Sequence, residues 1–276
     1  MLDNGNANNQ SAGLIAVDEP PPFRVLNPES TANVLLVCDH ASRRFPRSLG
    51  DLGLDPAART CHLAWDIGAG ALTERLASSL SLTAVLANYS RLVVDCNREL
   101  LDAAAFLKFG DGIPVRGNRD LSDAQKRQRA DEIYWPYHHA IERELERLRR
   151  LAAPIVFLSI HSFTPVLDAV SRPWEVGILW DRDRDTAVQL IDGFTRAGFN
   201  VGDNLPYSGK APQDFTVDRH AEGAGIPHAG IEIRQDLILE EDGVERLTRV
   251  MEPIVREFIR IESATDSRGP GLQRPS

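Results

Sequence analysis

The stretch Ile155-Val156-Phe157-Leu158-Ser159-Ile160-His161-Ser162-Phe163-Thr164-Pro165 decides the fold. Its six mostly β-branched or bulky residues, entered through Pro154, predict a short strand that is buried on both faces. Pro165 cannot continue a ladder, so His161 is expected at the carboxyl end of a central strand. Open α/β sheets bind ligands at that end. The alternative is a buried histidine that is hydrogen-bonded to the backbone.

A second apolar run ends in the same way. Asn33-Val34-Leu35-Leu36-Val37-Cys38 leads into Asp39-His40. Two buried strands that each deliver an imidazole at the same edge form a constellation, and a constellation favours function over a structural role.

The remaining periodicity predicts a single α/β domain. Apolar runs predict further strands, and stripes at helical spacing predict helices, one of them interrupted by Pro136. The strands are expected at 83–87, 91–95, 174–180 and 227–236, and the helices at 71–80, 122–148, 184–197 and 240–261. This alternation predicts a three-layer α/β/α domain with a mostly parallel sheet.

The ends of the chain are polar and are expected to lie outside that domain. Residues 1–22 are Asn-rich and then Pro-rich, which predicts a disordered and extended N-terminal arm. The domain is expected over 23–262, and the Ser/Gly/Pro-rich residues 263–276 are expected to form a flexible tail.

Composition limits the partners. The net charge of −9 argues against nucleic acid or an anionic membrane as a general partner, because both are bound through excess Lys and Arg. No signal peptide is visible, and no run approaches the ~18 apolar residues of a membrane span. Three cysteines without CxxC spacing favour a reducing, cytoplasmic setting. The sequence does not indicate an oligomeric state.

Several charged residues have both a structural and a functional interpretation. Asp66 precedes a predicted helix, where it could be an N-cap or a site carboxylate. Asp95-Cys96-Asn97-Arg98 follows a predicted strand, either as a salt-bridged corner or at a pocket. Glu232 and Arg234 alternate with isoleucines and therefore share one face, which is either solvent or the pocket.

The functional interpretations combine into one metal site. His40, His161 and a carboxylate would supply the three-ligand, open-position site of a hydrolytic zinc ion. Such an ion activates water and polarises a carbonyl, and Glu232 could carry the proton to a leaving amine.

Arginines extend this site. Arg91, Arg98 and Arg234 could bind the carboxylates of a small acidic substrate through bidentate pairs, and Arg91 is also a catalytic candidate beside Glu232. Asn97 and Tyr207, the latter in the loop 204–209, join the substrate-binding candidates.

Three other mechanisms are weaker. No GxSxG elbow supports a serine hydrolase. Cys38 and Cys96 each stand beside a carboxylate, which raises a thiol pKa and disfavours a cysteine nucleophile. A metal-free binding module for an acidic amino-acid derivative would keep the arginines and would not need Glu232.

The sequence resembles the N-formylglutamate amidohydrolase family over roughly residues 33–260. The resemblance rests on five stretches that occur in the family's order. They are Asp39-His40-Ala41-Ser42, Trp65-Asp66-Ile67-Gly68, Ser90-Arg91-Leu92-Val93-Val94-Asp95-Cys96-Asn97-Arg98, Ile160-His161-Ser162-Phe163-Thr164-Pro165 and Gly230-Ile231-Glu232-Ile233-Arg234-Gln235-Asp236.

This resemblance implies a phosphorylase/hydrolase-like fold, distantly related to zinc carboxypeptidases and zinc peptidoglycan amidases. It also implies hydrolysis of N-formyl-L-glutamate to formate and L-glutamate, a late step of histidine breakdown. By position, His40 and His161 look like the metal ligands, Glu232 like the general base, and Asn97-Arg98 like a carboxylate-binding pair.

One position departs from the carboxypeptidase pattern. Those enzymes take a ligand carboxylate three residues after the first histidine, and here that residue is Arg43. The third ligand is therefore expected to be Asp66, with Asp39 as the second choice, around one divalent ion, zinc.

Overall fold

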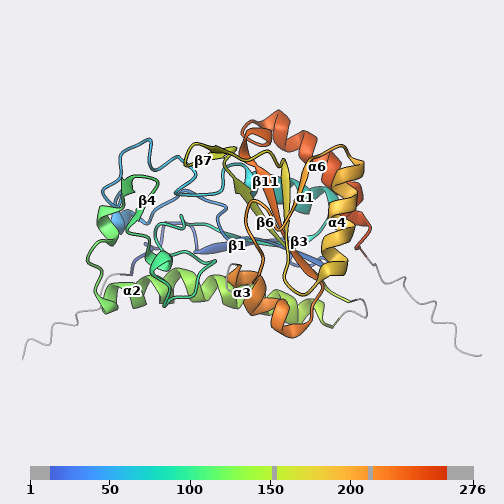
Figure 1. Cartoon of the computed structure of the whole chain (residues 1–276). Helices are drawn as coiled ribbons and strands as arrows, with labels where there is room; N and C mark the ends of the chain where they lie inside the picture. Colours follow the sequence, from blue (N-terminus) through green and yellow to red (C-terminus); the bar gives the residue numbers. More distant parts are fainter. Residues whose placement is uncertain (1–12, 151–153, 211–213, 260–276) are drawn as a thin grey trace, which may run out of the picture.

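A seven-stranded sheet runs through the described part of the chain, which comprises residues 13–150, 154–210 and 214–259 of this computed structural model (Figure 1). In spatial order its strands are β1 (Phe23–Leu26), β3 (Thr83–Ala87), β2 (Val34–Cys38), β6 (Val156–Phe163), β11 (His228–Arg234), β9 (Val176–Leu179) and β10 (Val201–Asp203). Strands β3, β2, β6 and β11 are parallel to one another. Strands β9 and β10 are parallel to each other and antiparallel to β11, and β1 is an antiparallel edge. The sheet is therefore mostly parallel, as predicted.

Helices cover both faces of this sheet. On one face lie α1 (Ala69–Leu80), α4 (Arg184–Arg196) and α6 (Glu241–Arg256). On the other lie α2 (Asp123–Arg129), α3 (Trp135–Leu148) and α5 (Phe215–His220), with α2 and α3 along the lower side in Figure 1. The three-layer α/β/α prediction is confirmed.

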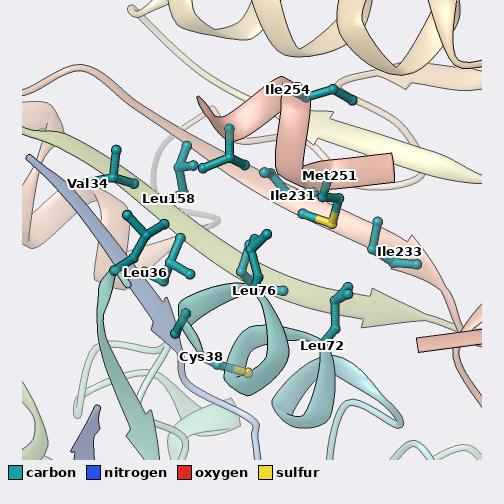
Figure 2. Close-up of a cluster of buried hydrophobic side chains, with 14 of the residues drawn as sticks. Val34, Leu36, Cys38, Leu72, Leu76, Leu158, Ile231, Ile233, Met251 and Ile254 are labelled. Atoms are coloured by element: carbon teal, nitrogen blue, oxygen red, sulfur yellow. The ribbon is translucent and has the colours of Figure 1, made fainter. Parts of the chain in front are cut away.

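Strand β6 shows why the sheet is central. All eight of its residues are buried, and successive side chains enter opposite cores because strand side chains alternate. Leu158 joins the core of α1 and α6, whereas Phe157 joins the core of α3. Figure 2 shows the first core, in which Leu158 lies among side chains of β2, β11, α1 and α6.

The predicted break at Pro136 is present. Ser122 and Gln125 form the expected capping box at the start of α2. A π-helical turn (Ala130–Tyr134) follows, and α3 then begins with Pro136 in its first turn. The backbone stays helical through this turn, and Trp135 N donates to Ala130 O. Pro136 cannot donate the next backbone hydrogen bond, which accounts for the irregular turn beside it.

The predicted strand at 91–95 is wrong. This segment is a buried turn in which Val93 N donates to Ser90 O at 2.9 Å and Asp95 N donates to Ala105 O at 2.9 Å. Its apolar side chains pack from a loop into two different cores. The run of buried apolar residues therefore resembles a strand in the sequence, although this segment pairs with no strand among the described residues. Short elements were also missed: β1, β10, α5, and the hairpins β4 (Phe109–Gly110)–β5 (Ile113–Pro114) and β7 (Val166–Leu167)–β8 (Val170–Ser171).

Single turns of helix complete the described secondary structure. They occur at Arg47–Leu49, Ala103–Phe106, Arg116–Asn118, Glu222–Ala224 and Gln235–Leu237.

Residues 13–22, predicted as part of a disordered and extended arm, pack against the domain. Leu14 is buried, and the backbone N–H groups of Leu14 and Ile15 donate to the carboxylate of Glu132 at 2.8 and 3.0 Å. The rest of the predicted arm (1–12) and the predicted tail (263–276) lie outside the described residues.

The three cysteines are free; Cys38 and Cys96 are buried and Cys61 is half-buried. Within the described residues, none of the helices combines the length and apolar character that a membrane crossing requires.

Candidate active site

A cavity of about 170 Å³ opens where β2, β6 and β11 end. It is smaller than the roughly 300–1,000 Å³ of pockets for drug-sized ligands, so it suits a small molecule. Its walls include His40, Asp66, Arg91, Asn97, Arg98, His161, Ser162, Leu179, Tyr207, Ser208, Asp214 and Glu232.

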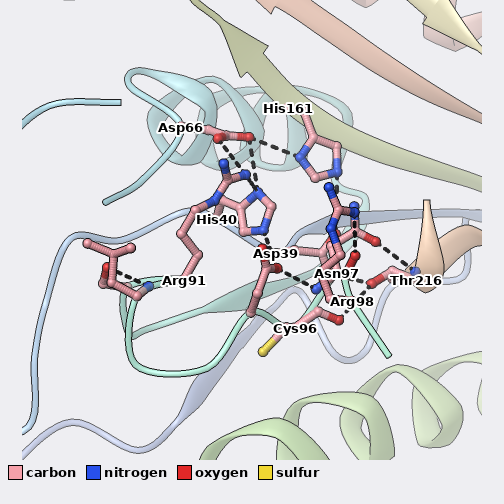
Figure 3. A network of polar contacts seen from close by, with 12 residues as sticks. Asp39, His40, Asp66, Arg91, Cys96, Asn97, Arg98, His161 and Thr216 are labelled. Carbon is pink, nitrogen blue, oxygen red and sulfur yellow. Dashed lines mark hydrogen bonds and ion pairs between the residues drawn. The ribbon is translucent and has the colours of Figure 1, made fainter. Parts of the chain in front are cut away.

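Two histidines and one aspartate converge inside this cavity (Figure 3). Asp66 Oδ2 lies 2.9 Å from His161 Nδ1 and 3.4 Å from His40 Nδ1. One potential ligand atom from each of the three buried residues lies within 4.8 Å of the other two. The alternative of a backbone-bonded His161 is wrong, because its ring contacts are side chains.

Asp66 is not the N-cap of α1. That position is Gly68, which makes no side-chain cap and has a φ of 81°. The carboxylate of Asp66 instead accepts from Ser162 N at 3.3 Å and pairs with Arg91 at 3.0 Å. The N-cap interpretation is wrong, and Asp66 lies in the cavity with both histidines.

A second buried carboxylate holds the far nitrogen of each histidine. His40 Nε2 lies 2.7 Å from Asp95 Oδ1, and His161 Nε2 lies 3.4 Å from Asp39 Oδ2. Such contacts fix the orientation of each ring. His161 Nδ1 faces the Asp66 carboxylate, and its Nε2 faces Ser159 and Asp39; despite burial, the contacts with Asp39 and Asp66 raise the pKa of His161 well above its usual value. Asp39, the second choice for third ligand, therefore lies behind His161, and the ligand-like group is completed by Asp66.

Charge keeps these carboxylates ionised despite their burial. Burial opposes the charged form of Asp66, but Arg91 and His40 hold its pKa well below the usual range. Burial likewise opposes ionisation of Asp39, yet its hydrogen bond to His161 brings the pKa to about 2. The cluster offers anionic oxygen and imidazole nitrogen, the donors that suit Zn²⁺.

Glu232 stands beside the cluster. It is the neighbour of His161 across the β11–β6 ladder, and its Oε2 is buried without a hydrogen-bond partner among the described residues. Burial raises the pKa of Glu232 to about 7. A carboxyl with such a pKa can both accept and return a proton near neutral pH.

Arg234 does not reach the cavity, which corrects its assignment as a substrate-binding residue. Its guanidinium pairs with Asp236 at 2.8 Å and donates to the carbonyl oxygens of Pro173 and Trp174. The alternation placed Arg234 on the face of Glu232, but it is two residues further along, where β11 runs out beside the start of β9.

The other predicted residues do line the cavity. Arg91 contacts His40 Nδ1 as well as Asp66. Asn97 Oδ1 accepts from Thr216 N at 2.8 Å, and Arg98 donates to the backbone oxygen of Asn97 at 2.9 Å. His40 contacts the carboxylate of Asp95, and Asn97 and Arg98 line the cavity, so the turn 95–98 lies at its edge.

The loop with Tyr207 is pressed onto the sheet. A Cβ on Gly177 would lie 2.3 Å from Leu205 O, and one on Gly202 would lie 2.4 Å from the same oxygen. Only glycine permits this approach.

Asp214 was missed. It is buried, caps α5 through Val217 N, and burial raises its pKa. The only signal in the sequence was its capping position before a six-residue helix, which is too weak to identify that helix.

Neither buried thiol suits a cysteine hydrolase. Burial raises the pKa of Cys38 to about 12 and that of Cys96 well above its usual value. A thiolate nucleophile needs the opposite shift.

Comparison with known proteins identifies the family of this chain. Residues 32–239 match the family described as N-formylglutamate amidohydrolase. A gene product of Agrobacterium tumefaciens, Atu2144, is 32% identical with a TM-score of 0.83, over 88% of this chain and 98% of that one. The N-formylglutamate amidohydrolase of Ralstonia eutropha JMP134 is 20% identical with a TM-score of 0.67, over 86% of this chain and 97% of that one.

None of the curated proteins matches this chain. The family match alone spans most of the domain and includes both histidines, Asp66 and Glu232. The protein therefore belongs to the N-formylglutamate amidohydrolase family and is an amidohydrolase.

Proposed function

We propose that this amidohydrolase uses one divalent metal ion, zinc, to hydrolyse N-formyl-L-glutamate or a similar N-acyl acidic amino acid. The products are a short carboxylic acid, formate in the first case, and the free amino acid. One observation carries the proposal: two imidazole nitrogens and a carboxylate converge beside the unpartnered oxygen of Glu232.

The donor set fits such an ion. His40 and His161 present Nδ1, Asp66 adds a charged oxygen, and Asp95 and Asp39 hold the outer nitrogens. A zinc ion held by three protein ligands supplies a Lewis acid that polarises a carbonyl and makes water acidic near neutral pH.

Glu232 moves the proton. Its Oε2 accepts a proton from the water that attacks the carbonyl carbon of the substrate, and the C–N bond then breaks as Glu232 returns that proton to the departing nitrogen. The amino acid leaves as a neutral amine instead of an unstable amide anion. A pKa of about 7 lets one group perform both transfers.

Arginines stabilise negative charge at two places on the substrate. Arg91, beside Asp66, can stabilise negative charge on the carbonyl oxygen during attack. Asn97 and Arg98 offer an amide and a guanidinium to the substrate's α-carboxylate.

The test is zinc content of the purified protein together with formate release from N-formyl-L-glutamate before and after chelation. We expect about one zinc per chain and formate release that chelation abolishes and added zinc restores. His161→Ala should lose both, while Arg234→Gln should keep both.

Two outcomes would contradict the proposal. Metal without formate release would mean another amide substrate. Neither metal nor turnover after addition of zinc, with ligand binding retained, would favour a binding module for an acidic amino-acid derivative.

A further inference from the structure

Arg172 is a buried arginine without an acidic partner. It follows strand β8, is 8% exposed, and forms no ion pair with any described residue. Its guanidinium lies 4.9 Å from the ring centroid of Tyr207 and 5.9 Å from that of Phe163. Burying a positive charge costs free energy unless another group compensates it, and aromatic faces do so only in part.

A second buried arginine shows what a purely structural one looks like here. Arg129 donates to Val93 O at 2.9 Å, to Asn118 Oδ1 at 2.6 Å and to Gly117 O at 3.4 Å. Its donors are taken up by fixed oxygens of the fold. The guanidinium of Arg172, by contrast, makes a single hydrogen bond among the described residues, to the hydroxyl of Tyr207 at 2.9 Å.

That bond leads to the cavity. Tyr207 lines the cavity wall, whereas Arg172, which donates to its hydroxyl, is not among the lining residues. Because the hydroxyl oxygen accepts from Arg172, the hydroxyl proton is free to donate elsewhere. Burial raises the pKa of Tyr207, so the hydroxyl keeps this proton at neutral pH. The pair therefore presents a donor to the cavity with a positive charge behind it.

The pair enters from a different side than Asn97 and Arg98. Tyr207 belongs to the loop that packs on β9 and β10, whereas the turn 95–98 is joined through Asp95 to His40 at the end of β2. Strands β6 and β11, which carry His161 and Glu232, lie between these two sides of the sheet. A substrate at the metal cluster thus meets Arg98 on one side and Tyr207, whose hydroxyl is bonded to Arg172, on the other.

We propose that Tyr207 and Arg172 bind the second carboxylate of a dicarboxylic substrate, while Asn97 and Arg98 bind the first. This rests on the proposed function and assigns the residues that would select a dicarboxylic substrate. Tyr207 donates the hydrogen bond, and Arg172 supplies the compensating charge and holds the hydroxyl in place.

The test compares L-glutamate with L-glutamine, which differ only in that second carboxylate. Binding to the zinc-loaded protein is measured by calorimetry for the wild type, Arg172→Gln and Tyr207→Phe. The matched control is Arg249→Gln, because Arg249 pairs with Glu245 on the exposed side of α6 and is not among the cavity residues. Melting curves confirm that each variant is folded.

We expect the wild type to prefer glutamate at least tenfold. Arg172→Gln should weaken glutamate binding at least tenfold and glutamine binding less than twofold, and Tyr207→Phe should reduce the preference in the same direction. Arg172→Lys, which keeps the charge, should retain part of it. Arg249→Gln should leave both affinities unchanged.

Equal losses for both ligands would show that Arg172 only supports the fold around the cavity, and would overturn the proposal, as would unchanged affinities. Kinetics separates this failure from that of the proposed function. Turnover of N-formyl-L-glutamate and N-formyl-L-glutamine with equal KM would contradict the second-carboxylate site and leave the proposed reaction intact. A preserved binding preference for glutamate without any turnover would contradict the proposed reaction and leave the second-carboxylate site intact.

Discussion

Each site histidine is fixed at both ring nitrogens, with Asp66 on the inner side and its own carboxylate on the outer side. Asp39 and Asp95 are not among the residues that line the cavity. We expect them, with an ion bound, to keep the proton on Nε2 and so leave Nδ1 facing the ion.

Asp95→Asn tests this role. The amide keeps the shape of the side chain but removes the charge that faces His40 Nε2, so zinc affinity should fall roughly 10- to 100-fold. A competition titration against a chromogenic chelator measures it. Asp111→Asn is the matched control, because Asp111 pairs with His62 at 2.6 Å on the surface. Equal affinities in the two variants would contradict the assignment.

Glu232→Gln should separate metal binding from chemistry. Zinc stoichiometry should persist, because Glu232 is not among the three converging ligands, while kcat should fall roughly 10²- to 10⁴-fold. The base must be deprotonated, and burial raises its pKa to about 7, so wild-type kcat/KM should decline as pH falls below about 7. The variant should lack that acidic limb. A kcat within a few-fold of wild type would mean that another group is the base.

The sequence predicted the residues that follow or end apolar strands. His40, His161 and Glu232 could be placed because strand ends in a parallel sheet share one edge. Arg234 and Arg172 show the limit of this reasoning. Alternation fixes the face of Arg234 but not how far the cavity extends, and Arg172 is defined by an aromatic ring 35 positions away in the chain.

At the scale of elements, the β6–β11 register is the decisive feature. It places Glu232 opposite His161 on adjacent parallel strands, so the base and a ligand are neighbours without any loop between them. On the other side of Glu232, β9 contributes Gly177, which leaves room for the loop with Tyr207.

Gly177→Ala should therefore move that loop. The new Cβ would meet Leu205 O at 2.3 Å, so the loop must lift and carry Tyr207 with it. We expect kcat/KM to fall by roughly 10- to 100-fold, mainly through KM, in a protein that still folds. Gly223→Ala is the control, since its nearest neighbour lies at 3.9 Å. Unchanged kinetics in Gly177→Ala would show that the loop does not position the substrate.

The central strands and the helices that cover the sheet could be predicted from the sequence. The loops and the edge strands could not. The buried strands and the amphipathic helices have patterns set by their own two faces. The turn 91–95 has the apolar content of a strand, but it fills space between loops, and only tertiary packing distinguishes the two. The antiparallel placement of β9 and β10 likewise depends on which edge of β11 remained open.

At the scale of the molecule, the site couples to stability. Asp39, Asp66 and Asp95 are buried around two imidazoles, and an ion that binds only this folded arrangement must stabilise it. At zinc about 100-fold above its Kd, Tm should rise by roughly 5–10 °C. Differential scanning calorimetry with and without a chelator measures the shift. His161→Ala, which lacks one ligand, should show none; a shift of equal size there would place the bound zinc elsewhere.

The molecule's boundaries were the least predictable feature. Residues 13–22 have the composition of a loose arm, yet Leu14 is buried and two backbone donors find Glu132, more than a hundred residues away in the chain. Composition reports what a segment can bury by itself, not what a distant acceptor offers it.

The distribution of the three thiols has a practical consequence. Cys38 and Cys96 are buried, whereas Cys61 is half-buried on the segment that leads into Asp66. A maleimide dye should therefore attach to the native protein at a single position, without any cysteine being replaced. Fluorescence from that dye would show whether the segment leading into Asp66 responds to zinc and substrate.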